Sequence, residues 1–252
     1  MKKLPTYIII GILASITISC ATPPRAPEVI PAKEIYPQFP SPVIRKDIVH
    51  IVAPGETLWR LGKMYDIGVE EIMRANGLKA AGRLGMGQRL IIPKAMPLRP
   101  VVPLYASSRW QYIIVHHSAT ETGNALSLFK LHLRRGFWHG LGYQFVISNG
   151  TAGKADGQIE VSPRWTHQDV GAHCKADNMN HCGIGICLVG NFSKDSVSEK
   201  QLDSLVYLVN ILRGYYNIPV KNILGHGQVR GAATECPGNN FPWKEFYERI
   251  KH

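Results

Sequence analysis

Two side chains with metal-binding chemistry lie ten positions apart in the loop GHGQVRGAATECPG, residues 225–238. They are His226 and Cys236, and neither has a second ligand nearby in a CxxC or HxxxH pair. Imidazole nitrogen and thiolate sulfur both bind zinc, and catalytic zinc sites use three protein ligands and leave a position for water. A zinc site here therefore needs a third ligand from elsewhere in the chain.

His116 is the best candidate, because it lies at the end of IIVHH (113–117), an apolar run that predicts a buried strand. A strand end holds a side chain rigidly, as a metal site requires. Because side chains alternate along a strand, only one of His116 and His117 can face the metal, and the pattern leaves open which. Ordinary roles compete with this interpretation: the chain has ten histidines, and a lone cysteine in an exported protein is more often half of a disulfide.

The elements that must position these residues lie in residues 109–252. Strands are predicted at WQYIIVHH (110–117), GYQFVIS (142–148), QIEVSP (158–163) and GIGICLVGNF (183–192). A short helix is predicted from Leu126 to Arg135, and a longer one between Ser198 and Tyr216, where Ser198 and Gln201 form a capping box. Strands mixed with helices predict an α/β core.

A smaller segment, residues 48–93, precedes this core. The β-rich IVHIV (48–52) leads into PGET, which is a helix-start signal, and RLIIP (89–93) is predicted to return as a strand. Apolar residues at helical spacing predict two short helices in between: Leu58, Leu61 and Tyr65, then Val69, Ile72 and Met73. The segment is therefore expected to fold as strand–helix–helix–strand.

Proline-bearing stretches are predicted to be linkers at residues 21–47 and 94–108. Seven prolines between Thr22 and Asp47 exclude regular helix or central strand and favour an extended, semi-rigid spacer. The net charge of +11 suggests an acidic partner, for which nucleic acid, anionic lipid and an anionic wall polymer all fit.

The first 20 residues, MKKLPTYIIIGILASITISC, have the layout of an export signal: two lysines, an apolar run from Leu4 to Ile18, then small residues. The run is shorter than the ~20 apolar residues of a spanning helix, although an uncleaved membrane anchor is the alternative. Export argues against nucleic acid as a partner and leaves the membrane surface and the cell wall.

The same segment resembles a bacterial lipoprotein signal, which implies lipid on Cys20. Ser19 fits that pattern, whereas Thr17 stands where Leu is usual. Residue 21 is Ala rather than Asp, which by this resemblance implies sorting to the outer membrane. We therefore expect residues 1–20 to be a signal peptide and the protein to be exported and lipid-anchored there, facing the periplasm.

Four motifs, IIVHHSAT, GFWHGLGYQFVI, GAHCKADNMNHCGIGICLVGNF and GHGQVRGAATECPG, are spread over residues 110–243. In this order they resemble the type-2 N-acetylmuramoyl-L-alanine amidases, zinc enzymes that share a fold with T7-type lysozyme and the peptidoglycan recognition proteins. The resemblance implies a mixed central sheet flanked by helices. It also implies hydrolysis of the amide between N-acetylmuramic acid and L-alanine of peptidoglycan, with Zn²⁺ bound by His116, His226 and Cys236.

Further roles follow from the same resemblance. Tyr143 matches the family's catalytic tyrosine, whose hydroxyl can orient water or steady the tetrahedral oxygen. Thr234 falls where members carry Lys or Thr; it can donate a hydrogen bond to an oxyanion but supplies no positive charge, and a solvent-facing loop position is the alternative. His173 and Asn180 lie in the stretch that members place along the stem-peptide groove, which predicts substrate contacts.

VAPGETLWRLGKMYDIGVEEIMRANGL and LGMGQRLIIP resemble a LysM module at residues 48–93. This implies a small βααβ domain that binds N-acetylglucosamine-containing glycans such as peptidoglycan, with the saccharide surface between the PGETL loop and the loop near Asn76. A small helical spacer is the alternative.

Two other functions compete with the amidase. One is a non-catalytic peptidoglycan recognition protein on the same fold, although members that only recognise the polymer commonly lack the cysteine ligand. The other is a structural lipoprotein that joins membrane to wall, which leaves Tyr143, His226 and Cys236 without a role. Among the remaining cysteines, Cys187 is expected to be a buried thiol, and Cys174 and Cys182 are a candidate disulfide.

Overall fold

The computed structural model describes residues 44–251. The expected signal peptide, the lipidation site Cys20 and the greater part of the first linker lie outside the described residues, so these remain predictions. Within residues 44–251, no helix has both the length and the apolar character needed to cross a membrane.

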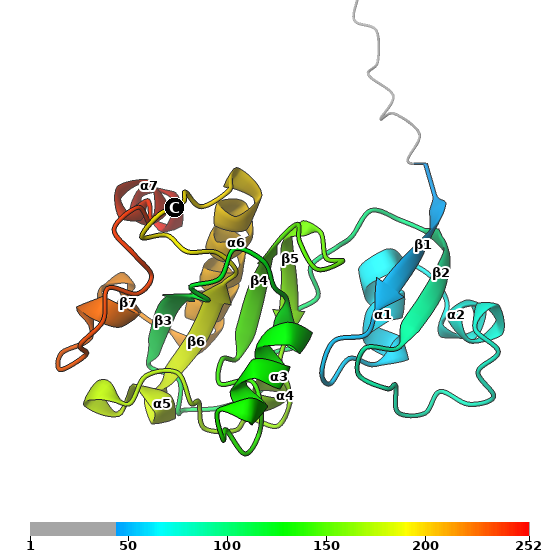
Figure 1. The fold of residues 1–252 in the computed structure, drawn as a ribbon, viewed down its shortest axis with the longest axis horizontal. Coiled ribbons are helices and arrows are strands. Elements are labelled where there is room, and N and C mark those ends of the chain that lie inside the picture. Colours follow the sequence, from blue (N-terminus) through cyan, green and yellow to red (C-terminus); the bar gives the residue numbers. More distant parts are fainter. Residues whose placement is uncertain (1–43, 252) are drawn as a thin grey trace, which may run out of the picture. The chain divides into compact units, whose positions relative to one another are not determined.

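The N-terminal domain is a βααβ unit around two antiparallel strands (Figure 1). Its elements are β1 (Lys46–Ile51), α1 (Leu58–Tyr65), α2 (Val69–Ala75) and β2 (Arg89–Ala95). Helix α1 begins after Thr57, whose side chain accepts a hydrogen bond from the Arg60 amide, as an N-cap residue does. Apolar residues of both helices and of β2 share one buried cluster that includes Leu61, Ile72 and Ile92. The predicted order of elements is confirmed.

The C-terminal domain is built on a five-stranded sheet in the order β5–β4–β6–β3–β7. The strands are β3 (Tyr112–His117), β4 (Phe145–Asn149), β5 (Asp156–Val161), β6 (Gly183–Leu188) and β7 (Ile223–Gly225). The pairs β4–β6, β6–β3 and β3–β7 are parallel, whereas β5 pairs antiparallel with β4. The mixed sheet expected from the sequence is confirmed.

Helices cover both faces of this sheet (Figure 1). On one face α6 (Glu199–Tyr216) packs Leu205 and Val209 against Phe145 and Ile186; on the other, α3 (Ala125–Arg134) packs against Val146 of β4 and Cys187 of β6. The capping box predicted at the start of α6 is present. Shorter helices are α4 (Pro163–Thr166) and α5 (Met179–Cys182).

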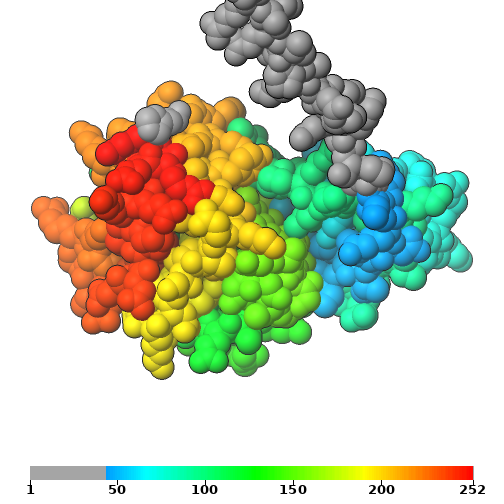
Figure 2. All heavy atoms as spheres, turned by 90° about the horizontal axis from the view of Figure 1, so that it is seen from above, coloured from blue at the N-terminus to red at the C-terminus, as the bar shows by residue number. Residues whose placement is uncertain are grey.

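The last helix of the described residues is α7 (Trp243–Ile250), which was not predicted from the sequence. Figure 2 shows this helix (red) against the segment that leads into α6 (yellow). Its Phe246 and Ile250 are fully buried in the α6 core, and Arg249 lies 2.8 Å from the carboxylate of Glu199. The helix therefore closes the core on the α6 side of the sheet.

Residues 94–108, which were expected to be a linker, begin within β2 and make hydrogen bonds to the C-terminal domain. Lys94 and Ala95 belong to β2. The indole nitrogen of Trp165 donates to the Pro103 carbonyl (2.7 Å), and the hydroxyl of Tyr216 donates to the Tyr105 carbonyl (2.7 Å). Proline removes a backbone donor but leaves its carbonyl acceptor, and the buried Trp165 uses the acceptor of Pro103 here.

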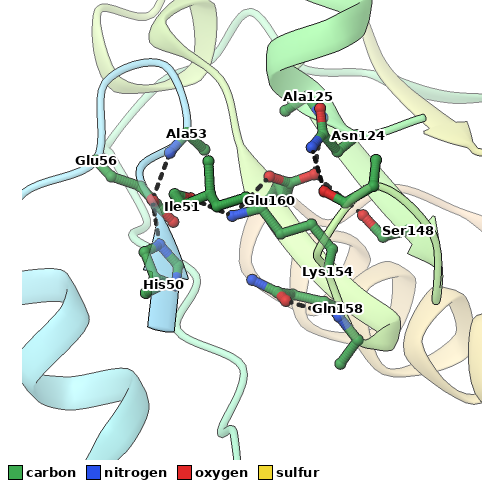
Figure 3. A network of polar contacts seen from close by, with 12 residues as sticks. His50, Ile51, Ala53, Glu56, Asn124, Ala125, Ser148, Lys154, Gln158 and Glu160 are labelled. Atoms are coloured by element: carbon green, nitrogen blue, oxygen red, sulfur yellow. Dashed lines mark hydrogen bonds and ion pairs between the residues drawn. The ribbon is translucent and has the colours of Figure 1, made fainter. Parts of the chain in front are cut away.

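A buried polar network joins the two domains (Figure 3), which belong to one compact unit of the chain. The ammonium group of Lys154 donates to the Ile51 carbonyl at the end of β1 (2.8 Å) and lies 3.3 Å from the carboxylate of Glu160 on β5. Glu160 also accepts from the Ala125 amide (2.7 Å) and the Ser148 hydroxyl (3.0 Å). A buried charge requires such partners, so the contact between the domains is specific.

The PGETL loop takes part in this contact. Gly55 has a φ of +76°, and a Cβ added there would lie 3.3 Å from Pro163 at the start of α4. Next to it, the buried carboxylate of Glu56 accepts from the Ala53 amide (2.7 Å) and pairs with His50 (2.7 Å). One border of the predicted saccharide surface therefore packs against the C-terminal domain, and glycan binding there remains a prediction.

Candidate metal and catalytic site

Strand β3 positions the first candidate ligand. Its side chains alternate, so His116 lies on the same face as Ile114 and is 1% exposed, whereas His117 lies on the other face. There the Nδ1 of His117 accepts from the Phe192 amide (3.2 Å). The sequence left open which of the two histidines joins the candidate site, and the structure places His116 there.

The glycine-rich loop brings the other two candidates to the same point. His226 directly follows β7, which pairs with β3, and the Gly227 amide donates to the Cys236 carbonyl (2.7 Å). A Cβ on Gly227 would lie 2.4 Å from the Thr234 carbonyl oxygen, and one on Gly225 would lie 2.6 Å from the Trp243 ring. These glycines are therefore required where the returning chain approaches the sheet edge.

His116, His226 and Cys236 form a compact donor set. One ligand atom from each residue lies within 4.8 Å of the others. The Nδ1 of His116 lies 3.7 Å from the Cys236 sulfur, and the ring centroids of His116 and His226 are 4.7 Å apart. Two imidazole nitrogens and one sulfur are the donors that zinc favours, and three protein ligands leave a position for water. The residues present therefore fit a zinc ion.

Burial sets the protonation of these donors. It lowers the pKa of His116 well below the ordinary value and also lowers that of His226, so both rings are neutral at neutral pH and can offer a lone pair. Burial raises the pKa of Cys236 to about 11. The thiol must therefore release its proton when a metal binds, as thiolate ligands do.

Tyr143 lies beside these three residues, and its ring centroid is 5.1 Å from that of His116. Burial raises its pKa well above the ordinary value, with nearby Cys187 and Cys236 adding to the effect. The phenol therefore stays protonated and can donate a hydrogen bond. His132, which was not predicted as a site residue, holds the backbone next to Tyr143. Its Nδ1 accepts a hydrogen bond from the amide of Gly142, the residue directly before Tyr143 (3.0 Å).

His132 carried a weak signal in the sequence. It falls within the apolar pattern of a predicted helix, where a polar side chain needs a partner. It is 6% exposed, and burial lowers its pKa to about 4. A neutral imidazole is therefore available as the acceptor that fixes the approach to Tyr143.

Thr234 is exposed and lies next to the cysteine of the donor set. Its hydroxyl oxygen accepts from the Cys236 amide (3.2 Å), which leaves its hydrogen free to donate elsewhere. This is compatible with the hydrogen-bonding role expected from the sequence.

His173 and Asn180, expected along the stem-peptide groove, contact protein groups. The Nδ1 of His173 lies 3.0 Å from the Nε2 of His116. The side-chain oxygen of Asn180 accepts from the amides of His173 (2.7 Å) and Cys174 (2.8 Å). The structure thus places both residues in the support of the candidate site, and contact with a stem peptide remains a prediction.

Within residues 44–251, the three cysteines outside the donor set are thiols. Cys187 is fully buried on β6, and Cys174 and Cys182 are free rather than joined in a disulfide. The sulfur of Cys174 faces the Ala176 carbonyl and that of Cys182 the Asn178 carbonyl. The thiols of Cys174 and Cys182 therefore each have a backbone acceptor within four residues of their own position.

Two segments of the chain match models of known protein families. Residues 106–239 match the family model described as N-acetylmuramoyl-L-alanine amidase, and residues 50–93 match that of the LysM domain. Peptidoglycan-recognition protein SC1a of Drosophila melanogaster is 32% identical over 143 residues, 53% of this chain and 70% of that protein. An N-acetylmuramoyl-L-alanine amidase of Sus scrofa is 27% identical over 159 residues, 56% of this chain and 24% of that protein.

Among solved structures, the N-acetylmuramoyl-L-alanine amidase LysC from Clostridium intestinale URNW aligns with a TM-score of 0.48. It is 33% identical to this chain and covers 57% of it and 89% of its own length.

Proposed function

Because the chain belongs to the N-acetylmuramoyl-L-alanine amidase family, we propose that it is a zinc-dependent hydrolase of peptidoglycan. It cleaves the amide between N-acetylmuramic acid and L-alanine, with His116, His226 and Cys236 as the metal ligands. One observation carries the proposal: the ligand atoms of His116 on β3 and of His226 and Cys236 in the glycine-rich loop lie within 4.8 Å of one another. A protein that only recognises the polymer has no need of such a set.

Zinc bound there would supply a Lewis acid for the amide carbonyl and lower the pKa of water to near ~7. The protein's own groups have separate tasks. Tyr143 remains a neutral phenol and donates its hydrogen to the nucleophilic water or to the tetrahedral oxygen. Thr234 donates a hydrogen bond to the same oxygen without adding charge. The ligand set carries one thiolate, which offsets part of the metal's charge.

The N-terminal LysM domain gives the enzyme its second contact with the wall. Binding to glycan keeps the catalytic domain at a high local concentration of its substrate. The net charge of +11 favours an acidic polymer as the partner. With the lipid on Cys20 and export to the outer membrane as further parts of the proposal, the active site faces the wall from the periplasmic side.

The test is the release of products from purified sacculi by the zinc-loaded protein. Mass spectrometry is expected to find peptides that begin with L-alanine and glycan with free lactyl groups. The Cys236→Ala variant is expected to release neither while it still sediments with sacculi. Full product release by that variant would refute the metal assignment.

Failure of the wild-type protein to release either product, with retained sedimentation, would favour the second candidate. That candidate is recognition of peptidoglycan without catalysis. It is supported by the 32% identity to a protein named as a peptidoglycan-recognition protein.

A further inference from the structure

The ring of His116 has two nitrogens, and only one of them belongs to the candidate metal site. Nδ1 faces the sulfur of Cys236 at 3.7 Å. Nε2 lies 3.0 Å from the Nδ1 of His173. The other nitrogen of His173, Nε2, lies 3.2 Å from the carbonyl oxygen of Gly183. Two rings and one carbonyl therefore form a chain of contacts that ends at the site.

The Gly183 carbonyl determines which ring nitrogens of His173 and His116 carry hydrogen. A carbonyl oxygen only accepts, so the Nε2 of His173 must carry the hydrogen. A neutral imidazole has one ring hydrogen, and the Nδ1 of His173 is then an acceptor. It follows that His116 donates from its own Nε2. This leaves a lone pair on the Nδ1 of His116, the nitrogen that faces Cys236.

The ring of His173 is held tightly enough to enforce this arrangement. A Cβ added to Gly171 or to Gly185 would lie 2.6 Å from an atom of the His173 ring. Backbone from two segments therefore closes on the ring, in space that only glycine leaves open. The side-chain oxygen of Asn180 fixes the His173 amide as well (2.7 Å).

We infer that His173 is a positioning residue that holds His116 as the Nε2–H tautomer and so presents its Nδ1 to the metal. The inference rests on the metal site of the proposed function but not on the reaction. Hydrogen bonds of this kind orient a ligating histidine and raise its basicity, and their loss typically costs about 10–100-fold in metal affinity. His173 therefore acts through His116 and need not touch the substrate.

Two substitutions of nearly equal size separate the hydrogen bond from the packing. In His173→Asn, the side-chain oxygen can take the place of Nδ1 and accept from His116. In His173→Leu, the side chain has a similar shape but no acceptor. Zinc affinity is measured by competition with a chromophoric chelator, and thermal unfolding of the metal-free proteins establishes that both variants are folded.

The Leu variant is expected to bind zinc about 10–100-fold more weakly than the wild type, and the Asn variant within a few-fold of it. Wild-type affinity in the Leu variant would overturn the inference. Equal weakening in both variants would also overturn it, because the packing of the ring and not its acceptor would then matter.

A second measurement needs no variant. Two-bond ¹H–¹⁵N correlation spectra of the metal-free wild-type protein report which nitrogen of each histidine is protonated. We expect Nε2–H for both His116 and His173, and an Nδ1–H tautomer at His116 would contradict the inference. Neither measurement uses substrate: zinc affinities in the expected order without amidase activity would refute the proposed reaction alone, whereas a wild type that binds no zinc would overturn both proposals.

Discussion

The buried carboxylate of Glu56 leads to a prediction about stability and pH. Burial alone would raise its pKa, but the hydrogen bond and charge of His50, with the charges of Lys154 and Arg60, lower it from 4.5 to about 2. Lys154 comes from the C-terminal domain, so part of this effect depends on the contact between the domains. Replacement by an uncharged isostere, Glu56→Gln, removes the titrating group.

The size of the effect follows from linkage. A carboxyl group that titrates near 2 in the folded state and near 4.5 in the unfolded state stabilises the folded state by about 3 kcal/mol at pH 7. Because the folded-state pKa is the lower one, this stability is fully present above about pH 4.5 and is lost as the pH falls through 2. At pH 3 about 1 kcal/mol of it is left.

Urea unfolding at pH 7 and pH 3 measures this. Glu56→Gln is expected to lower the free energy of unfolding by about 3 kcal/mol at pH 7 and by about 1 kcal/mol at pH 3. Glu71→Gln is the matched control, since Glu71 is exposed on α2, and it should change the free energy of unfolding little at either pH. If the loss for Glu56→Gln is the same at both pH values, the pKa of Glu56 is not lowered and the reasoning is wrong.

Three further predictions concern the catalytic domain. Tyr143→Phe should lower kcat for product release from sacculi by about 10²-fold with zinc content unchanged; unchanged kcat would remove Tyr143 from the mechanism. Leu205→Ala, at a fully buried position of α6, should lower the free energy of unfolding by about 2–5 kcal/mol, and a loss below about 1 kcal/mol would show that the core readily closes the cavity. Ser198→Ala should lower it by about 1 kcal/mol through loss of the capping box, as calorimetry can check, whereas no change would mean that water satisfies the helix end equally well.

The sequence predicted those parts of the fold that depend on local pattern. The helix after Ser198 has its capping box and apolar stripe in consecutive residues, so periodicity and capping were sufficient. Strands β3 and β6 contain the continuous apolar runs 113–115 and 183–188, and they were found from that pattern. By contrast, β7 has only three residues, too few for a periodic signal.

The site needed more than local pattern. His226 reaches His116 because β7 pairs in parallel with β3, where Ile223 lies opposite Ile113. Such pairing joins segments over a hundred residues apart, and spacing along the chain does not report it. The contact between His173 and His116 was hidden for the same reason. The corresponding sequence feature is the pair of glycines at 171 and 185, which leave room for the His173 ring. Their role can be recognised only when the structure places the ring between them.

X-ray absorption at the zinc edge of the zinc-loaded protein tests the central claim, that two imidazoles and one thiolate hold a single ion. We predict one sulfur at about 2.3 Å and two imidazole nitrogens at about 2.0–2.1 Å, together with a lighter oxygen ligand, and loss of the sulfur in Cys236→Ala. A wild-type spectrum without sulfur, or one unchanged by that substitution, would contradict the account.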